Sequence, residues 1–291
     1  MIQEAVQELI AGTDLDRAQV RAVMDQIMSG GATDAQIGAF LVALRIKGET
    51  VDEIVGCAEG MRKKATPIAT SRTNLIDTCG TGGDGSGTFN ISTTVAFVAC
   101  GAGLAVAKHG NRSISSQCGS ADVLAELGVN IEASPEKVGQ CIDEAGIGFL
   151  FAVALHGAMK YAIGPRKELA LRTVFNVLGP LTNPAGAKRQ LIGVYDSGLT
   201  DKIAGVLKEL GSQRAFVVHG SDGLDEITLT GSTKLSELSG GRVETREINP
   251  GDFALQPAEA GALVGGDAAQ NAQILRAVLD GEQGPRRDVV L

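Results

Sequence analysis

The sequence predicts an α/β protein in which a small all-helical domain precedes a larger domain with a mainly parallel central sheet. Residues 1–64 carry only helix signals, whereas strand and helix patterns alternate from residue 74 onward. Such alternation is typical of a parallel sheet, which binds ligands at the carboxyl ends of its strands. A chain of 291 residues that is 44% apolar is long enough for one large or two ordinary domains with real cores.

Helix starts divide the first 64 residues. Thr33-x-x-Gln36 and Thr50-x-x-Glu53 fit the capping box, and Thr13-x-x-Asp16 resembles it with an acid in the last position. Apolar residues follow two of these starts at helical spacing: Ile37, Phe40, Leu41 and Leu44, then Ile54, Val55, Ala58 and Met61. We therefore expect four short helices and a boundary near residues 65–72.

The remaining elements follow in alternation. Strands are expected at 74–77, 103–107, 147–152, 190–195 and 214–219, with a β-rich stretch at 227–248. Helices are expected after Asn90 and at 120–127, 135–144, 156–178, 199–210 and 267–279. The helix at 135 has a clear start, because Ser134 can cap it and proline is favoured at the first helical position.

A glycine loop, residues 80–88, separates the first expected strand from the helix after Asn90. It holds five glycines in the eight residues Gly80 to Gly87. Glycine lets the backbone approach a ligand closely, and Asn90 is a suitable N-cap for the following helix. A strand, a glycine loop and a helix N-terminus together predict an anion site, because backbone N–H groups and the helix dipole attract negative charge.

Two familiar phosphate loops do not fit this stretch. Gly80-x-Gly82-x-x-Gly85 matches the dinucleotide fingerprint, but residues 101–108 lack the acid that this fingerprint requires about 20 residues later. A Walker loop requires Gly-Lys-Ser/Thr, and Gly85 is followed by Ser86. A plain glycine turn is the remaining alternative, which the density of glycine and hydroxyl groups disfavours.

Charged groups follow two other expected strands. Lys108 and Arg112 come after 103–107 and could hold phosphate, or they could be surface charges. The acidic loop, residues 222–226, comes after 214–219 and ends in Asp225-Glu226. Hard Mg²⁺ uses one or two carboxylates with substrate phosphates, although two solvated turn acids are the plainer interpretation. The three histidines, His109, His156 and His219, are all expected in such loops. Each could take part in the site, or it could have only a structural role.

The bulk composition narrows the functional classes. The net charge of −8 argues against a general nucleic-acid binder. Five cysteines without a CxxC pair predict a reduced protein with neither a disulfide framework nor a zinc site. The first residues do not resemble a signal peptide, and no apolar run reaches membrane length. These observations predict a cytoplasmic protein with no membrane partner.

Five motifs in order resemble the anthranilate phosphoribosyltransferases of tryptophan biosynthesis. They are Gly80–Gly85, Asn90–Thr93, Lys108–Arg112, Gly119–Asp122 and Asn176–Pro184. The resemblance implies two hinged domains and a homodimer formed through the helical one. It places the helical domain at 1–70 with return helices at about 156–178, and the donor-binding α/β domain at 71–155 and 179–291. The active site would lie in the cleft between the domains.

The resemblance also implies the reaction. The phosphoribosyl group of 5-phosphoribosyl 1-pyrophosphate passes to the amine of anthranilate in the presence of Mg²⁺, and pyrophosphate leaves. The implied donor contacts are Gly80, Gly83, Asp84, Thr88, Asn90, Ile91, Ser92, Thr93, Lys108, His109, Gly110, Asn111, Arg112, Ser113, Ile114, Ser115, Ser116 and Ser120. The implied anthranilate residues are Gly80, Asn111, Arg166, His109 and His156, and the implied Mg²⁺ positions are Ser92, Asp225 and Glu226.

Three features depart from the family pattern. Gln117 stands where the family usually has Lys, and Val153 stands where Pro is usual. The sequence stops at Leu291, so the last helices of the family's α/β domain are expected to be missing. The alternatives are a pyrimidine nucleoside phosphorylase of related fold, a nucleic-acid-binding relative and an inactive remnant. The acidic pair favours the metal-dependent transferase over the phosphorylase.

Overall fold

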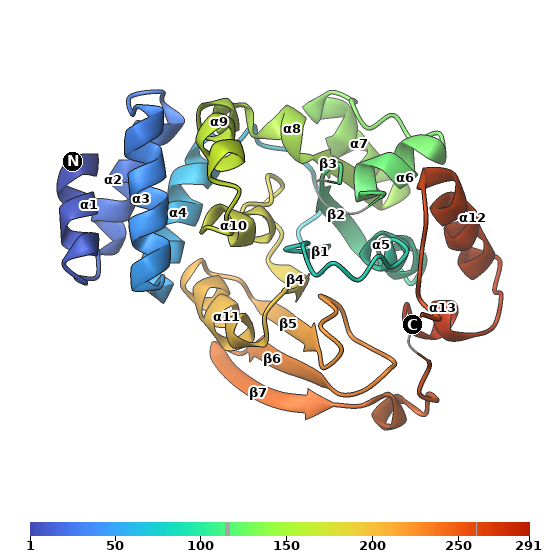
Figure 1. Ribbon diagram of the computed structural model, residues 1–291. Coiled ribbons are helices and arrows are strands. Elements are labelled where there is room, and N and C mark those ends of the chain that lie inside the picture. The colour runs from blue at the N-terminus through green and yellow to red at the C-terminus, as the bar shows by residue number, and fades with distance from the viewer. Residues whose placement is uncertain (114–116, 260) are drawn as a thin grey trace. The chain divides into compact units, whose positions relative to one another are not determined.

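The structure is a computed structural model that describes residues 1–113, 117–259 and 261–291. It divides into two compact units (Figure 1). The helical unit contains Met1–Pro67 and Val153–Pro184, and the sheet unit contains Ile68–Ala152 and Ala185–Leu291. Each unit is therefore assembled from two separate stretches of chain. Among the described residues, no helix has the length and apolar character needed to cross a membrane.

The helical unit contains the four predicted N-terminal helices and shorter helices from the second stretch. Its elements are α1 (Ile2–Ile10), α2 (Arg17–Met28), α3 (Asp34–Lys47), α4 (Val51–Lys64), the 3₁₀ turn Gly157–Met159, α9 (Lys160–Leu169) and α10 (Phe175–Leu181). The short helix α8 (Ala152–Leu155) lies at the junction of the two units in sequence. The expected helix at 156–178 is interrupted, because Ala170 ends α9 with a left-handed φ of 49°.

Close packing of α2 against α4 depends on two glycines one turn apart. A Cβ on Gly56 would lie 2.8 Å from the Arg17 carbonyl oxygen, and a Cβ on Gly60 would lie 2.5 Å from Met24 Cβ. Larger residues would therefore force the helices apart. The apolar residues predicted to line α3 and α4 are buried, with Phe40 and Leu44 at 0% exposure.

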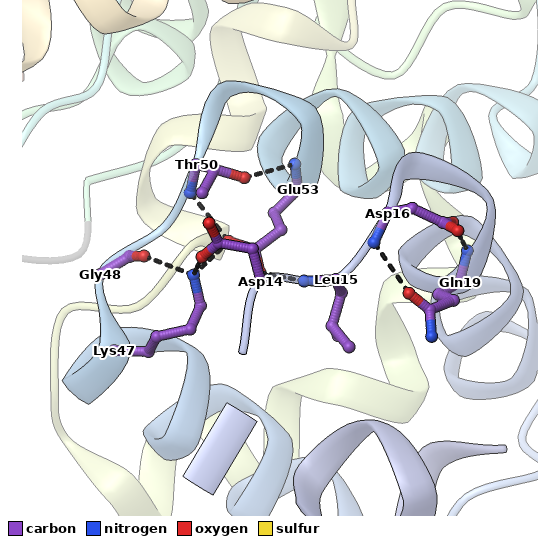
Figure 2. Close-up of polar contacts among 8 residues, drawn as sticks. All are labelled: Asp14, Leu15, Asp16, Gln19, Lys47, Gly48, Thr50 and Glu53. Carbon is purple, nitrogen blue, oxygen red and sulfur yellow. Dashed lines mark hydrogen bonds and ion pairs between the residues drawn. The ribbon is translucent and has the colours of Figure 1, made fainter. Parts of the chain in front are cut away.

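The predicted caps are confirmed at α3 and α4 and wrong at α2. Thr33 and Thr50 both form complete capping boxes. At α2 the N-cap is Asp16 and not Thr13. The Asp16 carboxylate accepts the Gln19 N–H at 2.8 Å, and Gln19 Oε1 accepts the Asp16 N–H at 2.8 Å (Figure 2). The sequence pattern places Asp16 at the third helical position, whereas its short carboxylate suits the cap itself.

Glu53 links two loops of the helical unit through a buried carboxylate (Figure 2). Its Oε1 accepts the Leu15 N–H at 2.9 Å, and its Oε2 accepts the Thr50 N–H at 2.8 Å. Lys47 Nζ donates to Oε2 at 2.9 Å and also contacts Asp14. Since the Lys47 side chain is only 6% exposed, this ion pair is shielded from solvent. The carboxylate thus ties the loop before α2 to the loop before α4.

The sheet unit is built on seven strands, and the prediction of a mainly parallel sheet is confirmed. The strands are β1 (Leu75–Gly80), β2 (Ala105–Gly110), β3 (Ile147–Phe151), β4 (Arg189–Gly193), β5 (Arg214–Gly220), β6 (Thr233–Ser239) and β7 (Arg242–Ile248). Their order is β3-β2-β1-β4-β5-β6-β7. The first five are parallel, and β6 and β7 are added antiparallel at one edge.

The sheet unit also contains several helices, some of which pack directly on the sheet (Figure 1). They are α5 (Ile91–Gly101), α6 (Ser120–Glu126), α7 (Pro135–Ala145), α11 (Thr200–Glu209), α12 (Ala268–Leu279) and α13 (Pro285–Asp288). Two 3₁₀ turns, Ser197–Leu199 and Pro250–Phe253, complete the unit. The helix α5 packs on β1 and β2, α7 on β2 and β3, and α11 on β5 and β6. This arrangement leaves the loops at the strand ends to carry polar groups.

Candidate functional site

The candidate site lies at the carboxyl ends of β1, β4 and β5. The strand order reverses direction between β1 and β4, and such a switch point is where open α/β sheets bind ligands. The glycine loop leaves β1, and the acidic loop leaves β5. The chain therefore brings two of the motifs singled out in the sequence to one edge of the sheet.

The glycine loop has the conformation that its composition predicts. Gly82 and Gly85 have φ of 65° and 74°, and a Cβ on either would meet no atom within 4 Å. Strain of the left-handed backbone, and not crowding, therefore favours glycine at both positions. The loop is held at its far end, where Thr88 forms a β-bridge to Val264 and Phe89 is buried. Within the loop, the N–H groups of Thr81, Gly82 and Ser86 donate to Gly193, Asp225 and Asp84, so these bonds fix its conformation.

Asp225 is seated against two glycines that face one another across β1 and β4. Gly80 and Gly193 are register partners. A Cβ on Gly80 would lie 2.7 Å from Asp225 Oδ2, and a Cβ on Gly193 would collide with the Asp225 backbone carbonyl. Asp225 Oδ2 also accepts the Gly82 N–H at 2.8 Å. The acidic loop thus fits into a notch that only residues without side chains can form.

Glu226 and its neighbours make this notch strongly acidic. Desolvation of the carboxylate and the nearby charge of Asp84 raise the pKa of Glu226 to about 7, although Lys108 and the Ser92 N–H at the start of α5 oppose the shift. Burial, together with the charges of Glu226 and Asp84, raises the pKa of Asp225 well above its usual range. A bound cation would relieve this repulsion, so both carboxylates suit a hard divalent metal.

The fit to Mg²⁺ rests on two carboxylates and not on a complete protein cage. Across the residues that the structure describes, no cluster of three or more His, Cys, Asp or Glu side chains could hold a metal ion. Magnesium commonly keeps several waters and uses one or two carboxylates with the oxygens of a phosphate ligand. Asp225 and Glu226 fit that mode, and the Ser92 N–H at the start of α5 donates to Glu226.

Lys108 belongs to β2 and not to a surface loop, which corrects the sequence interpretation. Its side chain is 3% exposed, and Nζ donates to the Thr78 carbonyl and lies 3.4 Å from Ser92 Oγ. Burial lowers the pKa of the Lys108 ammonium, while Asp77 and Glu226 act in the opposite direction. The alternative of a surface charge is therefore wrong for Lys108, which places a cation under the notch.

Two of the three histidines also lie in strands and not in loops. His109 is in β2, where its N–H donates to Asp77 Oδ1 at 3.0 Å and the residue is buried. His219 is in β5, and its Nδ1 lies 2.7 Å from the Val194 carbonyl oxygen. His156 does lie between elements, in the helical unit, and is 5% exposed. Burial lowers the pKa of His156 to about 4, so its imidazole is neutral at pH 7.

A short turn follows the end of β2. Gly110 ends the strand, and the Asn111 carbonyl accepts the Ala121 N–H at 3.1 Å. Arg112 is exposed and donates from Nη1 to Asp122 Oδ1 at 2.8 Å. Asp122 also accepts the Ser113 and Gly119 N–H groups, so it organises this turn. The predicted donor contacts Ile114, Ser115 and Ser116 lie outside the described residues.

Asn90 occupies the N-cap position of α5, but its side chain does not cap the helix. Its Nδ2 donates to the Cys118 carbonyl at 3.1 Å, and its Oδ1 accepts from Asn271 Nδ2 at 3.0 Å. The predicted capping bond is therefore wrong, because more distant partners use the amide. The Asn90 side chain therefore accepts no N–H group from the first turn of α5. In that turn the Ser92 N–H donates to Glu226 instead.

Arg166, the predicted anthranilate contact, lies in α9 of the helical unit. Its guanidinium carbon is 5.1 Å from the centre of the Phe175 ring. Burial lowers the pKa of this guanidinium, although an arginine remains charged at neutral pH. Stacking on an aromatic ring holds the planar fork in one orientation, which suits recognition of a carboxylate.

Sequence patterns missed two residues that shape the site. The sequence predicts Gly193 only as part of a strand, and Asp77 only as the end of one. Asp77 is fully buried and fixes the β2 backbone at His109. A buried acid inside an apolar strand was the available signal for Asp77. Gly193 gave no signal, because its partner Asp225 is distant in sequence.

A groove also lies in the sheet unit, next to the far end of the glycine loop, because Val264 lines it and pairs with Thr88. This groove, of about 660 Å³, runs between α12 and α13 and is lined by residues such as Gln273, Ile274 and Arg286. None of the candidate site residues lines it. The site therefore rests on the chemistry at the strand ends and not on the size of a cavity.

Comparison with known proteins identifies the class of this fold. Residues 72–291 match the profile of the glycosyl transferase family a/b domain, and residues 3–65 match its helical bundle domain. Anthranilate phosphoribosyltransferase from Moorella thermoacetica is 58% identical over 291 residues, which is all of this chain and 86% of that protein. The chain thus belongs to the anthranilate phosphoribosyltransferase family of these two-domain glycosyl transferases.

Solved structures agree with this assignment. The crystal structure of anthranilate phosphoribosyltransferase from Thermus thermophilus has a TM-score of 0.93 and 44% identity, covering 98% of this chain and 85% of that one. The Saccharomyces cerevisiae enzyme in complex with PRPP and Mg has a TM-score of 0.89 and 28% identity, covering 99% and 85%. The same yeast enzyme has also been solved in complex with 4-fluoroanthranilate.

Proposed function

We propose that this protein transfers the phosphoribosyl group of 5-phosphoribosyl 1-pyrophosphate to the amine of anthranilate. The products are N-(5-phosphoribosyl)anthranilate and pyrophosphate, and the reaction belongs to tryptophan biosynthesis. The observation that carries the proposal is 58% identity to an anthranilate phosphoribosyltransferase over the whole of this chain. The acidic notch beside a glycine loop supplies a physical reason for the donor chemistry.

The donor would bind at the strand ends of the sheet unit. The glycine loop and the start of α5 would face the phosphate groups, because a helix N-terminus favours negative charge. Mg²⁺, held by Asp225 and Glu226 with Ser92 nearby, would offset the negative charge of the pyrophosphate. Lys108 is buried nearby, where its Nζ bonds to Thr78 and Ser92 and its charge acts on Glu226. We assign the other predicted donor contacts to this site on the same grounds of motif and position.

The bond changes need little acid–base assistance from the protein. The bond between C1 of the ribose and the pyrophosphate oxygen breaks, and the anthranilate nitrogen forms the new bond to C1. Aromatic amines are neutral at pH 7, so the lone pair is available, and the nitrogen loses a proton after the bond forms. Charge stabilisation and positioning of the two substrates therefore supply most of the catalysis.

The acceptor residues are assigned by family motif and by chemistry. Arg166 offers a planar, oriented guanidinium for the anthranilate carboxylate. His156 is neutral at pH 7 and can line an acceptor path without adding charge. Asn111, Gly80 and His109 complete the proposed acceptor set.

Assembly and location form part of the proposal. We expect a homodimer through the helical unit, where Ile10 and Ile46 are 74% and 81% exposed. The dimer is expected from the family resemblance, and these two side chains serve as probes of it. Sedimentation or light scattering would test the dimer, and an Ile46→Asp variant should weaken it. A cytoplasmic location, with no nucleic-acid or membrane partner, is consistent with the net charge of −8.

The first experiment follows anthranilate fluorescence with PRPP and Mg²⁺, with and without EDTA. Metal-dependent loss of anthranilate is expected. Asp225→Ala with Glu226→Ala should abolish turnover while circular dichroism stays unchanged, and unchanged activity would contradict the metal assignment. Arg166→Ala should raise the KM for anthranilate; a rise in the donor KM alone would contradict the acceptor role.

A further inference from the structure

We propose that Asp222 is a positioning residue of the candidate metal site, because its carboxylate sets the path of the acidic loop that carries Asp225 and Glu226. The inference rests on the proposed function, since it concerns how the carboxylates for Mg²⁺ are held. Asp222 itself lies outside the proposed Mg²⁺ and substrate contacts.

Asp222 joins both ends of the turn that follows β5. Its Oδ1 accepts the Leu224 N–H at 3.2 Å. Its Oδ2 accepts the hydroxyls of Thr228 and Thr230, both at 2.6 Å. One carboxylate thus bonds to residues on either side of Asp225 and Glu226, which closes the segment between them into a loop.

The two ends that Asp222 joins are fixed to the rest of the sheet unit. Leu224 is 3% exposed and belongs to a buried cluster with Phe89 and Ile91, which flank Asn90 at the start of α5. Thr228 is 1% exposed, and its N–H donates to Thr233 Oγ1 at 3.0 Å, at the first residue of β6. The carboxylate of Asp222 therefore connects the acidic loop to both anchors.

The notch tolerates little error in this path. Gly193 faces the Asp225 backbone carbonyl so closely that even a methyl group would not fit. A loop that relaxed would carry Asp225 away from the Gly82 N–H, which it now accepts at 2.8 Å. Groups that orient metal ligands commonly change metal affinity or activity by about 10–100-fold when they are removed, and Asp222 would act in that range through the backbone of the loop.

A matched control exists in the same unit. Asp143 in α7 also accepts two hydroxyls and one backbone N–H, from Thr70 and Ser71. Those partners precede β1, whose opposite end leads into the glycine loop. Asp143→Ala therefore removes the same number of hydrogen bonds at the far end of the strand.

The test compares the unaltered protein with Asp222→Ala, Asp222→Asn and Asp143→Ala. Thermal melting is measured alone and with Mg²⁺ plus inorganic pyrophosphate, because a ligand raises the melting temperature according to its affinity. Turnover is measured against Mg²⁺ and against anthranilate. For Asp222→Ala we expect about 10–100-fold weaker binding of Mg²⁺ with pyrophosphate and the same shift in half-saturating Mg²⁺, with the KM for anthranilate unchanged. Asp222→Asn, which keeps an acceptor oxygen, should recover part of the loss.

The outcomes separate the inference from the proposed function. Equal behaviour of Asp222→Ala and Asp143→Ala in both binding and half-saturating Mg²⁺ would overturn the positioning role. If Asp222→Ala does not fold, Thr230→Val removes one of the same bonds at a half-buried position, and an unchanged affinity would again overturn it. Binding of Mg²⁺ and pyrophosphate without turnover by the unaltered protein would refute the proposed function and leave the Asp222 comparison valid. Absence of binding by the unaltered protein would overturn both.

Discussion

Substitution of Gly193 by alanine should disable the candidate site with a single methyl group. The new Cβ would fall on the Asp225 carbonyl oxygen and lie 3.3 Å from Asp225 Cα. The obstacle is backbone, so no rotation of a side chain can remove it. Since non-bonded carbon atoms prefer about 3.5–4.0 Å, the acidic loop must move by an amount on the order of 2 Å.

The expected magnitude follows from that displacement. Overpacking of this kind costs about 1–3 kcal/mol of stability. The effect on catalysis should be larger, because a misplacement of about 1 Å can lower a rate by about 100-fold. A loss of at least 100-fold in kcat/KM for PRPP corresponds to about 2.7 kcal/mol of transition-state stabilisation.

The assay combines anthranilate fluorescence with thermal melting. Gly101→Ala is the control, because Gly101 lies in the last turn of α5 and a Cβ there would meet nothing within 4 Å. That variant should keep full activity and stay within about 1 kcal/mol of the starting stability. If Gly193→Ala retained turnover within a few-fold of the unaltered protein, the notch would not hold Asp225 as we infer.

Other predictions concern the supporting structure. Glu53→Ala should destabilise the protein by about 3–5 kcal/mol, because it breaks a buried ion pair. Asp16→Ala removes an exposed helix cap and should cost only about 1 kcal/mol. Similar melting temperatures for the two variants would contradict this difference. His156 has a pKa of about 4 in the folded protein, below its ordinary value of 6.5. Its contribution of about 3 kcal/mol to the free energy of unfolding is therefore present above pH 6.5 and is lost as the pH falls through 4. His156→Asn should therefore flatten the melting temperature between pH 7 and pH 4, and an unchanged slope would exclude the buried neutral imidazole. Asp122→Ala should release Arg112 and raise the KM for PRPP more than the KM for anthranilate. Steady-state kinetics measure both constants, and an equal rise in the two would contradict a role of Asp122 in donor binding.

Local signals accounted for much of the fold. The capping boxes at Thr33 and Thr50 and the apolar spacing after them lie where the structure has α3 and α4, because a cap and its helix are encoded within a few residues. Strand limits were less certain. The strand β2 runs on through Lys108 and His109, which their polarity had assigned to a loop. Pairing with β3 and the buried Asp77 carboxylate stabilise these residues in the sheet, and neither partner is local.

The sequence by itself determined the glycine loop, the acidic pair and the alternation that brings both to the carboxyl ends of parallel strands. It also determined the family, through five motifs in order. Only the tertiary structure decided that Gly80 and Gly193 form a notch for Asp225 and that Lys108 is buried beneath it. The hydrogen bond from Gly82 to Asp225 spans 143 residues. Local propensity has no influence at that range, so such contacts exist only once the strands are in register.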